Sequence, residues 1–549
     1  MISSLWGFCV GLMHPNWQLA IEGGQVWAKL VTYPHHNPNF MYLNQAWTII
    51  HQLTGIFLLS GLSEKILSMM ISGLMGMISC MAISSMVYIF SRSLTFSALF
   101  PVFFFLIEKK MALGANYPIM LWDVPHTYGA LSLSLVILVL VLIALKKNRL
   151  SGLLLGLFPS IHIAWAFSLV LIALFLIAWN FSAFKKRFYD CVPGLLLGGA
   201  ISIISFVDYQ YEKIALIPSP DQLQYIQAFY QWDCHRISIS MSHPSLWINC
   251  FTIIFSVFYL NTQKEISESQ QFIFVAMIGS AFWGIVAAIM SYFPEYLPLT
   301  IYQLMPTRLL NINCICFIAC LAGCLVNQQF RGNILIISWI LFLISGKLLS
   351  FCLLSLSTAL IYSGMSVFRE IFQSSYLFIR SFCNQHKFGE HIHIFLLAII
   401  HVQFMISNAS HIQKFYKHTD NVLEKAQKSN GMLVTASDMM LVQARTQRPV
   451  LLYGESLDML MYALSSGPQM NKILQDIYGI SLFDPPESVI HKGGLTRYID
   501  KDVWEKRSLD EWIALKEKYR ITHVITYANY QLNLNIIAKN NHYALYEIN

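Results

Sequence analysis

The chain has 549 residues, of which 56% are hydrophobic and only 12% are charged. Ordinary globular proteins carry about twice that share of charged residues, so the composition excludes a typical soluble enzyme and favours a membrane protein. The formal net charge is +7, and we expect no nucleic-acid partner.

Apolar segments long enough to cross a bilayer recur from the N-terminus to about Asn408. They predict a polytopic α-helical membrane protein with roughly 11 to 13 transmembrane helices in residues 1–408. The first segment is not followed by a small-residue cleavage site, so we interpret it as a span and not as a removed signal. The cysteines end at Cys383 and form no CxxC pair, which indicates small apolar core residues.

Basic clusters predict the orientation, because short cytoplasmic loops gather Lys and Arg. The clusters at residues 146–149 and 185–187 bracket an apolar stretch that is broken near its middle. This pattern predicts a pair of short helices that leaves the cytoplasmic face and returns to it. The outer loops 208–243 and 292–307 then face the extracytoplasmic side, together with the C-terminal part of the chain. We expect a bacterial inner membrane.

From about His411 the charge rises, and the segments "GMLVTA", "RPVLLY", "THVITY" and "HYALYEI" predict strands. Amphipathic helical segments alternate with them. This alternation predicts a small α/β extracytoplasmic domain over residues 409–549 with a largely parallel sheet. The segment contains no glycine-rich nucleotide-binding motif, so we interpret it as an accessory domain.

Polar residues gather directly after the first span. Glu22 lies where that helix leaves the membrane, and residues 21–33 have the spacing of an interfacial helix. An acid at this boundary is either functional or simply solvated. His35 and His36 follow between prolines, which hold them near the membrane surface. Adjacent side chains of an extended segment point in opposite directions, so the two do not form a good metal pair.

Two further clusters open later helices at the same predicted face. Asp123 and His126 stand before a long apolar helix, where the Asp could also act as an N-cap. Arg308 opens a later span. An interfacial Arg either extends to the lipid head groups or clamps a phosphate through its planar pair of donors.

The long outer loop holds the remaining cluster, which contains Asp233, His235 and Arg236. Each residue alone is a weak signal, since loops tolerate polar side chains. An acid, an imidazole and a guanidinium within four positions nevertheless favour binding of an anionic group.

This layout resembles the GT-C superfamily of integral-membrane glycosyltransferases, which use polyprenyl-phosphate or polyprenyl-diphosphate sugars at the extracytoplasmic face. The essential acid of the family's first outer loop maps onto Glu22, and a second acid before a later helix maps onto Asp123. The resemblance implies an inverting transfer with a carboxylate base. The chain departs from the family pattern in placing Gly-Gly after a lone Glu22, and it lacks the WWD-type signature of oligosaccharyltransferases.

The residues fit this chemistry. Glu22 is the candidate base, Arg308 and Arg236 are candidate phosphate clamps, and Asp123 with His126 would bind the acceptor or the sugar. The expected partners are a polyprenyl-phosphate-linked sugar donor, a lipid or glycan acceptor and membrane lipids. A divalent metal such as Mg or Mn stays open, since no ligand spacing requires one.

Two alternatives stay open. A polysaccharide polymerase or ligase would act on a lipid-diphosphate-linked glycan with outer-face Arg and His, without Glu22 as the base. A secondary transporter would show broken helices in two related halves. The sequence shows one clear break, near His162, and no internal repeat.

Overall fold

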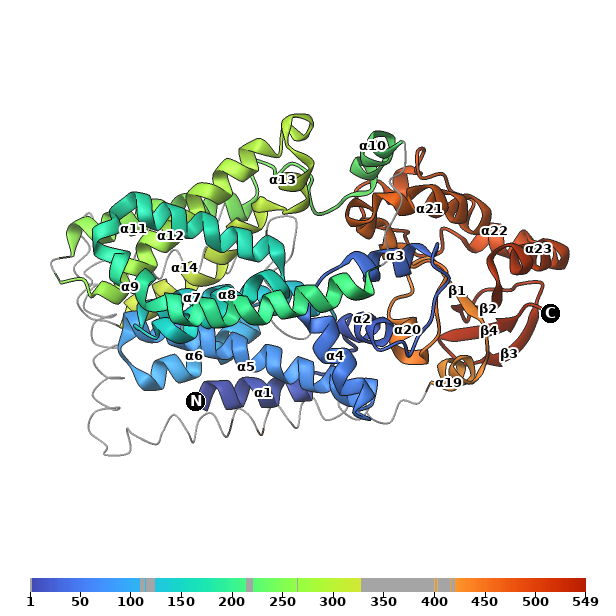
Figure 1. Cartoon of the computed structure of the whole chain (residues 1–549), viewed down its shortest axis with the longest axis horizontal. Helices are drawn as coiled ribbons and strands as arrows, with labels where there is room; N and C mark the ends of the chain where they lie inside the picture. Colours follow the sequence, from blue (N-terminus) through green and yellow to red (C-terminus); the bar gives the residue numbers. More distant parts are fainter. Residues whose placement is uncertain are drawn as a thin grey trace, which may run out of the picture.

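The computed structural model describes residues 2–108, 124–213, 221–263, 265–326 and 420–549, together with positions 114, 399, 402 and 415. A bundle of long helices forms one part of the molecule, and residues 420–549, called here the C-terminal region, form the other (Figure 1). Short helices α2, α3 and α20 lie where the two parts meet (Figure 1).

The bundle part contains the following elements: α1 (Ile2–Met13), α2 (Ala20–Trp27), α3 (Pro38–Gln45), α4 (Ile49–Leu59), α5 (Glu64–Ser91), α6 (Leu94–Glu108), α7 (Thr127–Ala144), α8 (Asn148–Ile161), α9 (Ile163–Glu212), α10 (Gln222–Trp232), α11 (Pro244–Thr262), α12 (Glu268–Met290), η1 (Pro294–Tyr296), α13 (Leu299–Gln303), η2 (Pro306–Arg308) and α14 (Leu309–Val326).

Within the described residues, six helical segments are long and apolar enough to cross a membrane: Glu64–Ser91, Thr127–Ala144, Ile163–Tyr211, Pro244–Thr262, Glu268–Met290 and Leu299–Cys324. The chain is therefore a polytopic α-helical protein, as the composition predicts. The apolar helices α1 and α4 are shorter. Several of the expected spans fall within residues 327–419, most of which lie outside the described residues, so the full count stays a prediction.

The two basic clusters meet at one end of the bundle. Glu268 accepts ion pairs from Lys146 at 2.9 Å and from Arg187 at 3.3 Å. The Arg187 guanidinium also donates to the carbonyl groups of Ile143 and Ala144. We call this end, defined by Lys146, Arg187 and Glu268, the basic end. Its composition matches the predicted cytoplasmic loops.

The chain between the basic clusters reverses twice. The helix breaks at His162, where φ is −162°, and kinks again inside α9 at Asn180, where φ is −163°. The first reversal is the predicted one. Glycines let the flanking segments approach closely, because a Cβ at Gly156 would lie 2.4 Å from the Leu195 carbonyl oxygen.

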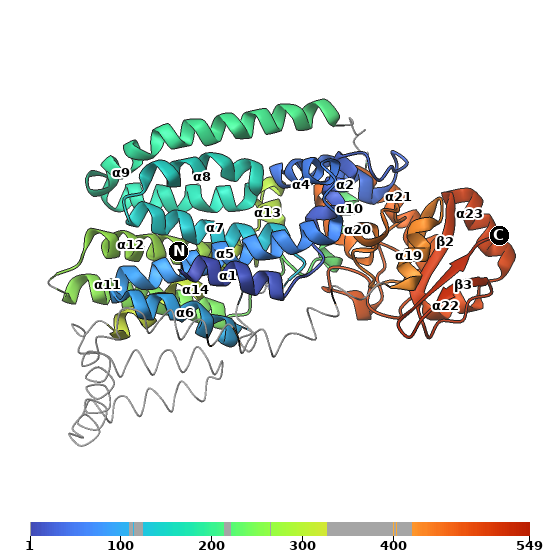
Figure 2. The same ribbon diagram turned by 90° about the horizontal axis from the view of Figure 1, so that it is seen from below.

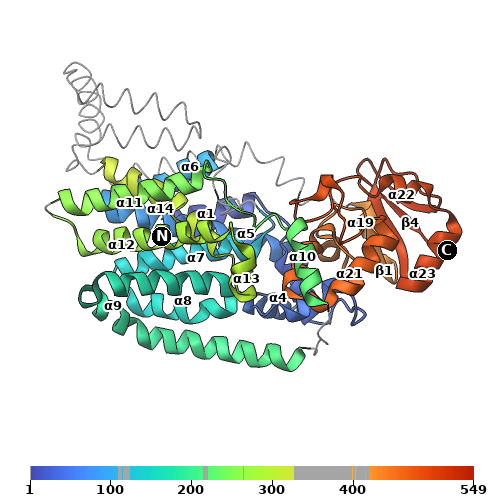
Figure 3. The same cartoon turned by 90° about the horizontal axis from the view of Figure 1, so that it is seen from above.

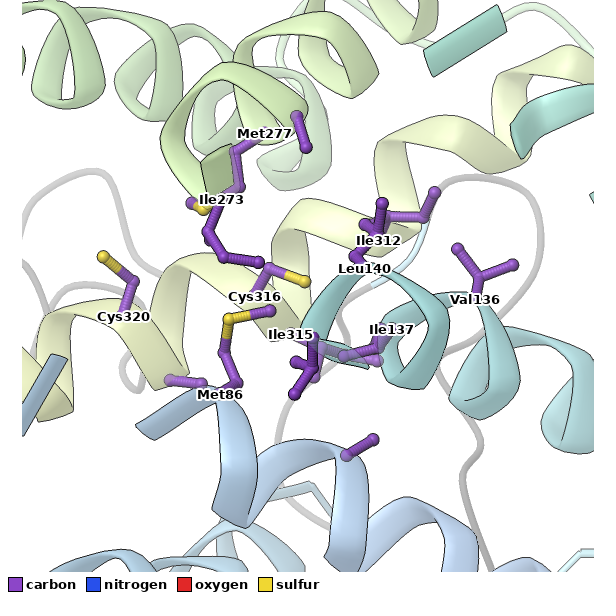
Figure 4. Close-up of a cluster of buried hydrophobic side chains, with 14 of the residues drawn as sticks. Met86, Val136, Ile137, Leu140, Ile273, Met277, Ile312, Ile315, Cys316 and Cys320 are labelled. Carbon is purple, nitrogen blue, oxygen red and sulfur yellow. The ribbon is translucent and has the colours of Figure 1, made fainter. Parts of the chain in front are cut away.

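The bundle core lies where α5, α7, α12 and α14 meet (Figure 4). Met86, Ile137, Ile273 and Cys316 point into this centre from the four helices, and each is at most 1% exposed. The cysteines of the described part are free thiols, and those of α14 are buried. They serve as small apolar core residues, as the sequence predicts.

The C-terminal region contains α19 (Asn421–Lys428), β1 (Met432–Thr435), α20 (Val442–Thr446), η4 (Gly454–Tyr462), η5 (Leu464–Ser466), α21 (Gly467–Ile473), η6 (Leu474–Tyr478), η7 (Glu487–Val489), α22 (Lys501–Lys506), α23 (Leu509–Tyr519), β2 (Ile521–Tyr527), β3 (Asn535–Lys539) and β4 (Tyr543–Glu547). A second buried core holds these elements together.

The sheet order is β1-β2-β4-β3. β1 pairs with β2 in parallel, whereas β4 pairs with both β2 and β3 in antiparallel orientation. The prediction of a largely parallel sheet is therefore wrong. No helix lies between β2 and β4, and a parallel pair needs such a crossover. The predicted strand "RPVLLY" makes only an isolated bridge from Val450 to Leu433, and β3 was not predicted.

Candidate functional site

Glu22 is buried in α2, against the C-terminal region. Its Oε1 atom accepts hydrogen bonds from the Tyr453 hydroxyl at 2.9 Å and from the Ala444 backbone N–H at 3.2 Å. Its carbonyl oxygen accepts the side-chain amide of Gln443 at 3.0 Å. The sequence missed this arrangement because the partners lie more than 400 residues away. The carboxylate holds α20 and the following segment against α2.

The chain after α2 continues this contact. α2 ends at Trp27, and Lys29 takes a left-handed φ of 58°, so the helix is shorter than the predicted interfacial helix over residues 21–33. Tyr33 donates its hydroxyl to Gln443 at 2.6 Å and accepts from the Val450 N–H at 3.2 Å. Burial raises the pKa of the Tyr33 hydroxyl. These bonds connect an extended outer segment to the C-terminal region.

Asn37 and Asn39 extend the same contact with side-chain amides. Asn37 donates to the Leu451 carbonyl, and Asn39 donates to the Val450 carbonyl, each at 2.9 Å. His35 and His36 lie beside these anchors and are exposed. The structure thus keeps both predicted histidines away from the buried contact.

A second buried group forms around Asp233 and Arg236 in the outer loop. Asp233 Oδ1 accepts from Arg236 Nη1 at 3.2 Å and from the His235 backbone N–H at 2.8 Å. Tyr302 donates to Asp233 Oδ2 at 3.0 Å. The two charged side chains are only 1% and 2% exposed. Such burial is costly unless both charges are paired, which explains the number of partners.

The C-terminal region supplies two more members of this group. Asp458 Oδ1 lies 3.5 Å from Arg236 Nη1, and Asp458 Oδ2 lies 3.5 Å from His235 Nε2. Arg236 Nη2 donates to the Tyr462 hydroxyl at 2.8 Å. The sequence prediction missed both residues. The segment "SLDMLMYAL" lies largely in the 3-10 helix η4, in which residues four apart do not share a face, so its spacing gave no signal.

Arg308 and His126 lie close to this group. Arg308 is buried, and its Nη1 atom lies 3.4 Å from Nε2 of His162. His126 occupies the N-cap position of α7. Burial lowers the pKa of the His126 imidazole, and His235 and Arg308 lower it further, while Asp458 acts in the opposite direction. These two predicted residues therefore stand within electrostatic reach of the outer-loop cluster.

We define the polar cluster as His126, Asp233, His235, Arg236, Arg308 and Asp458. Five of these six residues were predicted from the sequence, and the structure brings them together. Glu22 is not part of this cluster, because it accepts hydrogen bonds from Gln443, Ala444 and Tyr453. Asp123 lies outside the described residues.

The polar cluster combines charges of both signs, and the Arg236 guanidinium is already bonded to Asp233 and Tyr462. Among the described residues, no group of three or more His, Cys, Asp or Glu side chains is placed to hold a metal ion. The cluster instead offers two guanidinium groups and two imidazoles beside two carboxylates. Guanidinium groups recognise phosphate oxygens through paired donors.

The chain was compared with protein-family models, curated proteins and solved structures. No family model, no curated protein and no solved structure matches the chain. The chain is a polytopic α-helical protein with six candidate membrane spans in its described part and a C-terminal region built on a mixed four-stranded sheet.

Proposed function

We propose that the protein is a membrane glycosyltransferase that moves a sugar from a polyprenyl-phosphate donor to a lipid or glycan acceptor. The observation that supports this most is the convergence of Arg308, Arg236, His126 and His235 beneath the C-terminal region. This polar cluster lies at the end of α7 and α14 opposite the basic end, which is the extracytoplasmic face under the positive-inside rule. A lipid-linked donor presents its phosphate at this level of the membrane.

The transfer requires two kinds of groups. The acceptor oxygen attacks the anomeric carbon, the bond from that carbon to the phosphate oxygen breaks, and the acceptor proton moves to a carboxylate. The phosphate leaves with the bonding electrons, so positive charge beside it lowers the barrier. We assign Glu22 as the base, Arg308 and Arg236 as the phosphate-binding residues, and His126 with Asp123 as acceptor or sugar ligands.

The GT-C layout supports this assignment, with an acid after the first apolar helix and a C-terminal region at the same end of the bundle. The base role places one demand on Glu22. Its Oε1 atom already accepts two hydrogen bonds, so proton transfer to that atom would break one of them.

One observation favours a second candidate, a polymerase or ligase that acts on a lipid-diphosphate-linked glycan. The hydrogen bonds of Glu22 to Ala444 and Tyr453 give this acid a structural role. A polymerase or ligase would use the Arg and His side chains of the polar cluster and would not require Glu22 as the base.

The test is a transfer assay on the full-length protein in lipid nanodiscs. Undecaprenyl phosphate carrying mannose, glucose, galactose or N-acetylglucosamine is supplied with membrane lipid extract, and released undecaprenyl phosphate is measured by mass spectrometry. We expect release by the wild type and strong loss in Glu22→Gln and Arg308→Lys. Arg149→Lys, an exposed substitution beside the basic end, is the matched control. Consumption of a diphosphate-linked glycan by an active Glu22→Gln variant would instead support the ligase.

A further inference from the structure

A separate cavity of about 360 Å³ lies between the segment from α2 to α3, the start of α4 and the end of α9. Figures 2 and 3 show the end of the long helix α9 beside α2 and α4. The cavity is large enough for part of a small-molecule ligand. Glu22, Arg236 and Arg308 do not line it, although Gly23 beside Glu22 does.

Aromatic and aliphatic side chains form most of the cavity wall, including Trp27, Phe40, Leu43, Trp47 and Tyr209. A wall of this kind accepts either the ring of a sugar or a hydrocarbon chain. The polar groups of the wall decide between these two ligands.

Several polar groups of the wall are bonded to the protein itself. The indole N–H of Trp27 donates to Asp208, and that of Trp47 donates to Ser205, each at 3.1 Å. The Gln52 amide donates to Asp208 at 2.7 Å and to the Ser205 carbonyl at 2.8 Å. Sugar hydroxyls would have to break these bonds, since a polar group without a partner is costly. The wall therefore favours a hydrocarbon chain.

Exposed apolar side chains lie on the two helices that flank the cavity. α4 exposes Leu53 and Ile56 at 47% and 51%, and the last turns of α9 expose Ile204 and Val207 at 69% and 61%. Large apolar side chains exposed on helices of a membrane protein face the bilayer. An acyl chain beside these side chains is already in an apolar environment, so its transfer onto the aromatic wall costs little.

Two basic groups lie at the exposed side of the cavity. Lys29 and His35 both line it, and both are exposed. A cation near the membrane surface attracts an anionic lipid head group by about 1 kcal/mol. An apolar cavity wall with basic side chains at its exposed side is complementary to a lipid with an anionic head group.

We propose that this cavity binds an acidic membrane phospholipid, with one acyl chain against the aromatic wall and the phosphate beside Lys29 and His35. The bound lipid would fix the segment from α2 to α3 in the position where it contacts the C-terminal region. The proposal does not depend on sugar transfer and can be measured without it.

The experiment uses native mass spectrometry of the full-length protein after removal of lipid in detergent. The probes are dioleoyl-phosphatidylglycerol, which is acidic, and dioleoyl-phosphatidylcholine, which is neutral overall. We expect one phosphatidylglycerol bound per chain and weaker binding of phosphatidylcholine. Leu43→Trp fills the cavity and should reduce the phosphatidylglycerol adduct at least tenfold. Leu196→Trp, on the exposed face of α9, is the matched control and should bind as the wild type does.

A second variant tests the head group. Lys29→Asn removes the charge and keeps a residue that tolerates the left-handed backbone. It should weaken phosphatidylglycerol binding about fivefold, the factor expected for one Lys at a membrane surface, and leave phosphatidylcholine binding unchanged. If Leu43→Trp does not fold, Ala46→Leu fills the same cavity.

Three results would overturn the proposal. The first is an unchanged phosphatidylglycerol adduct in the folded cavity-filling variant. The second is equal binding of the two phospholipids by the wild type. The third is complete displacement of phosphatidylglycerol by an equimolar amount of undecaprenyl phosphate, which would assign the cavity to the polyprenyl lipid.

Discussion

The Oε1 atom of Glu22 accepts a hydrogen bond from the hydroxyl group of Tyr453 at 2.9 Å, across 431 positions of the sequence. The same hydroxyl accepts the backbone N–H of Gln443 at 2.6 Å. Burial raises the pKa of the Tyr453 hydroxyl, and the neighbouring Glu22 charge raises it further, so the hydroxyl keeps its proton and donates it. One buried acid thus joins α2 to the C-terminal region, and its structural and chemical roles predict different responses to substitution.

Glu22→Gln separates the two roles. The amide oxygen can still accept the bonds from Tyr453 and Ala444, so the C-terminal region should stay docked. The amide cannot accept a proton, and loss of a general base costs ~10² to 10⁴ in rate. We expect that loss in the nanodisc transfer assay, with undecaprenyl phosphate still bound. Turnover close to that of the wild type would restrict Glu22 to its structural role.

Tyr453→Phe removes the structural bond and leaves the carboxylate in place. Loss of this hydroxyl also leaves the Gln443 N–H without its acceptor, at a cost of about 1 to 3 kcal/mol. We expect a lower thermal unfolding temperature and faster hydrogen exchange in residues 442–453, with transfer per folded molecule largely retained. Tyr211→Phe serves as the control, because that side chain is 88% exposed. Equal exchange in the two variants would contradict the docking role.

Arg308→Lys keeps the charge and loses the planar pair of donors. If Arg308 binds the departing phosphate, transfer should fall at least ~10²-fold, the cost of losing one donor to a developing negative charge. The transfer assay and the amount of protein in the membrane are measured together. Full activity at normal expression would restrict Arg308 to a structural role, such as its contact with His162.

The sequence was informative where one local signal determines the structure. The basic clusters predicted that Lys146 and Arg187 lie at the same end of the bundle, because membrane topology places Lys and Arg on one side. The break near His162 was expected from the proline at position 159, although α8 continues through that proline to Ile161. Short apolar runs located β1, β2 and β4, and most residues of these strands are buried without alternation.

The sequence was less informative where long-range packing decides. Asp458 and Tyr462 contact Arg236 from a segment more than 220 positions away. No local pattern in either segment predicts this contact. Glu22 read alone suggested a substrate-facing or solvated acid, whereas its partners lie in the C-terminal region. β3 is short, largely exposed and irregularly paired, so it lacks the buried apolar run that reveals a strand.

The orientation of the chain can be tested with a membrane-impermeant maleimide. Lys147→Cys lies beside the basic end and Glu517→Cys lies in α23, and both native side chains are exposed. We expect labelling of Glu517→Cys in intact cells and of Lys147→Cys only after permeabilisation. The wild type, with its native cysteines, gives the background. The reverse result would place the polar cluster at the cytoplasmic face and remove the proposed donor from its reach.

Helix packing in the bundle gives a prediction with an internal control. A Cβ at Gly156 would lie 2.4 Å from the Leu195 carbonyl oxygen, whereas a Cβ at Gly199 would meet no atom within 4 Å. Both glycines are helical, so Ala at either position gains up to about 1 kcal/mol in helix propensity. Gly156→Ala must also separate α8 from α9, and such overpacking typically costs about 1 to 3 kcal/mol.

We therefore expect Gly156→Ala to unfold at a lower temperature than the wild type in nanodiscs and Gly199→Ala to equal or exceed it. α8 ends next to His162, whose Nε2 atom lies 3.4 Å from Arg308. A displaced α8 would move this imidazole, so Gly156→Ala should also reduce transfer while Gly199→Ala does not. Equal unfolding temperatures for the two variants would show that α8 and α9 are not in close contact at Gly156. The proposed effect of that contact on Arg308 would then also be contradicted.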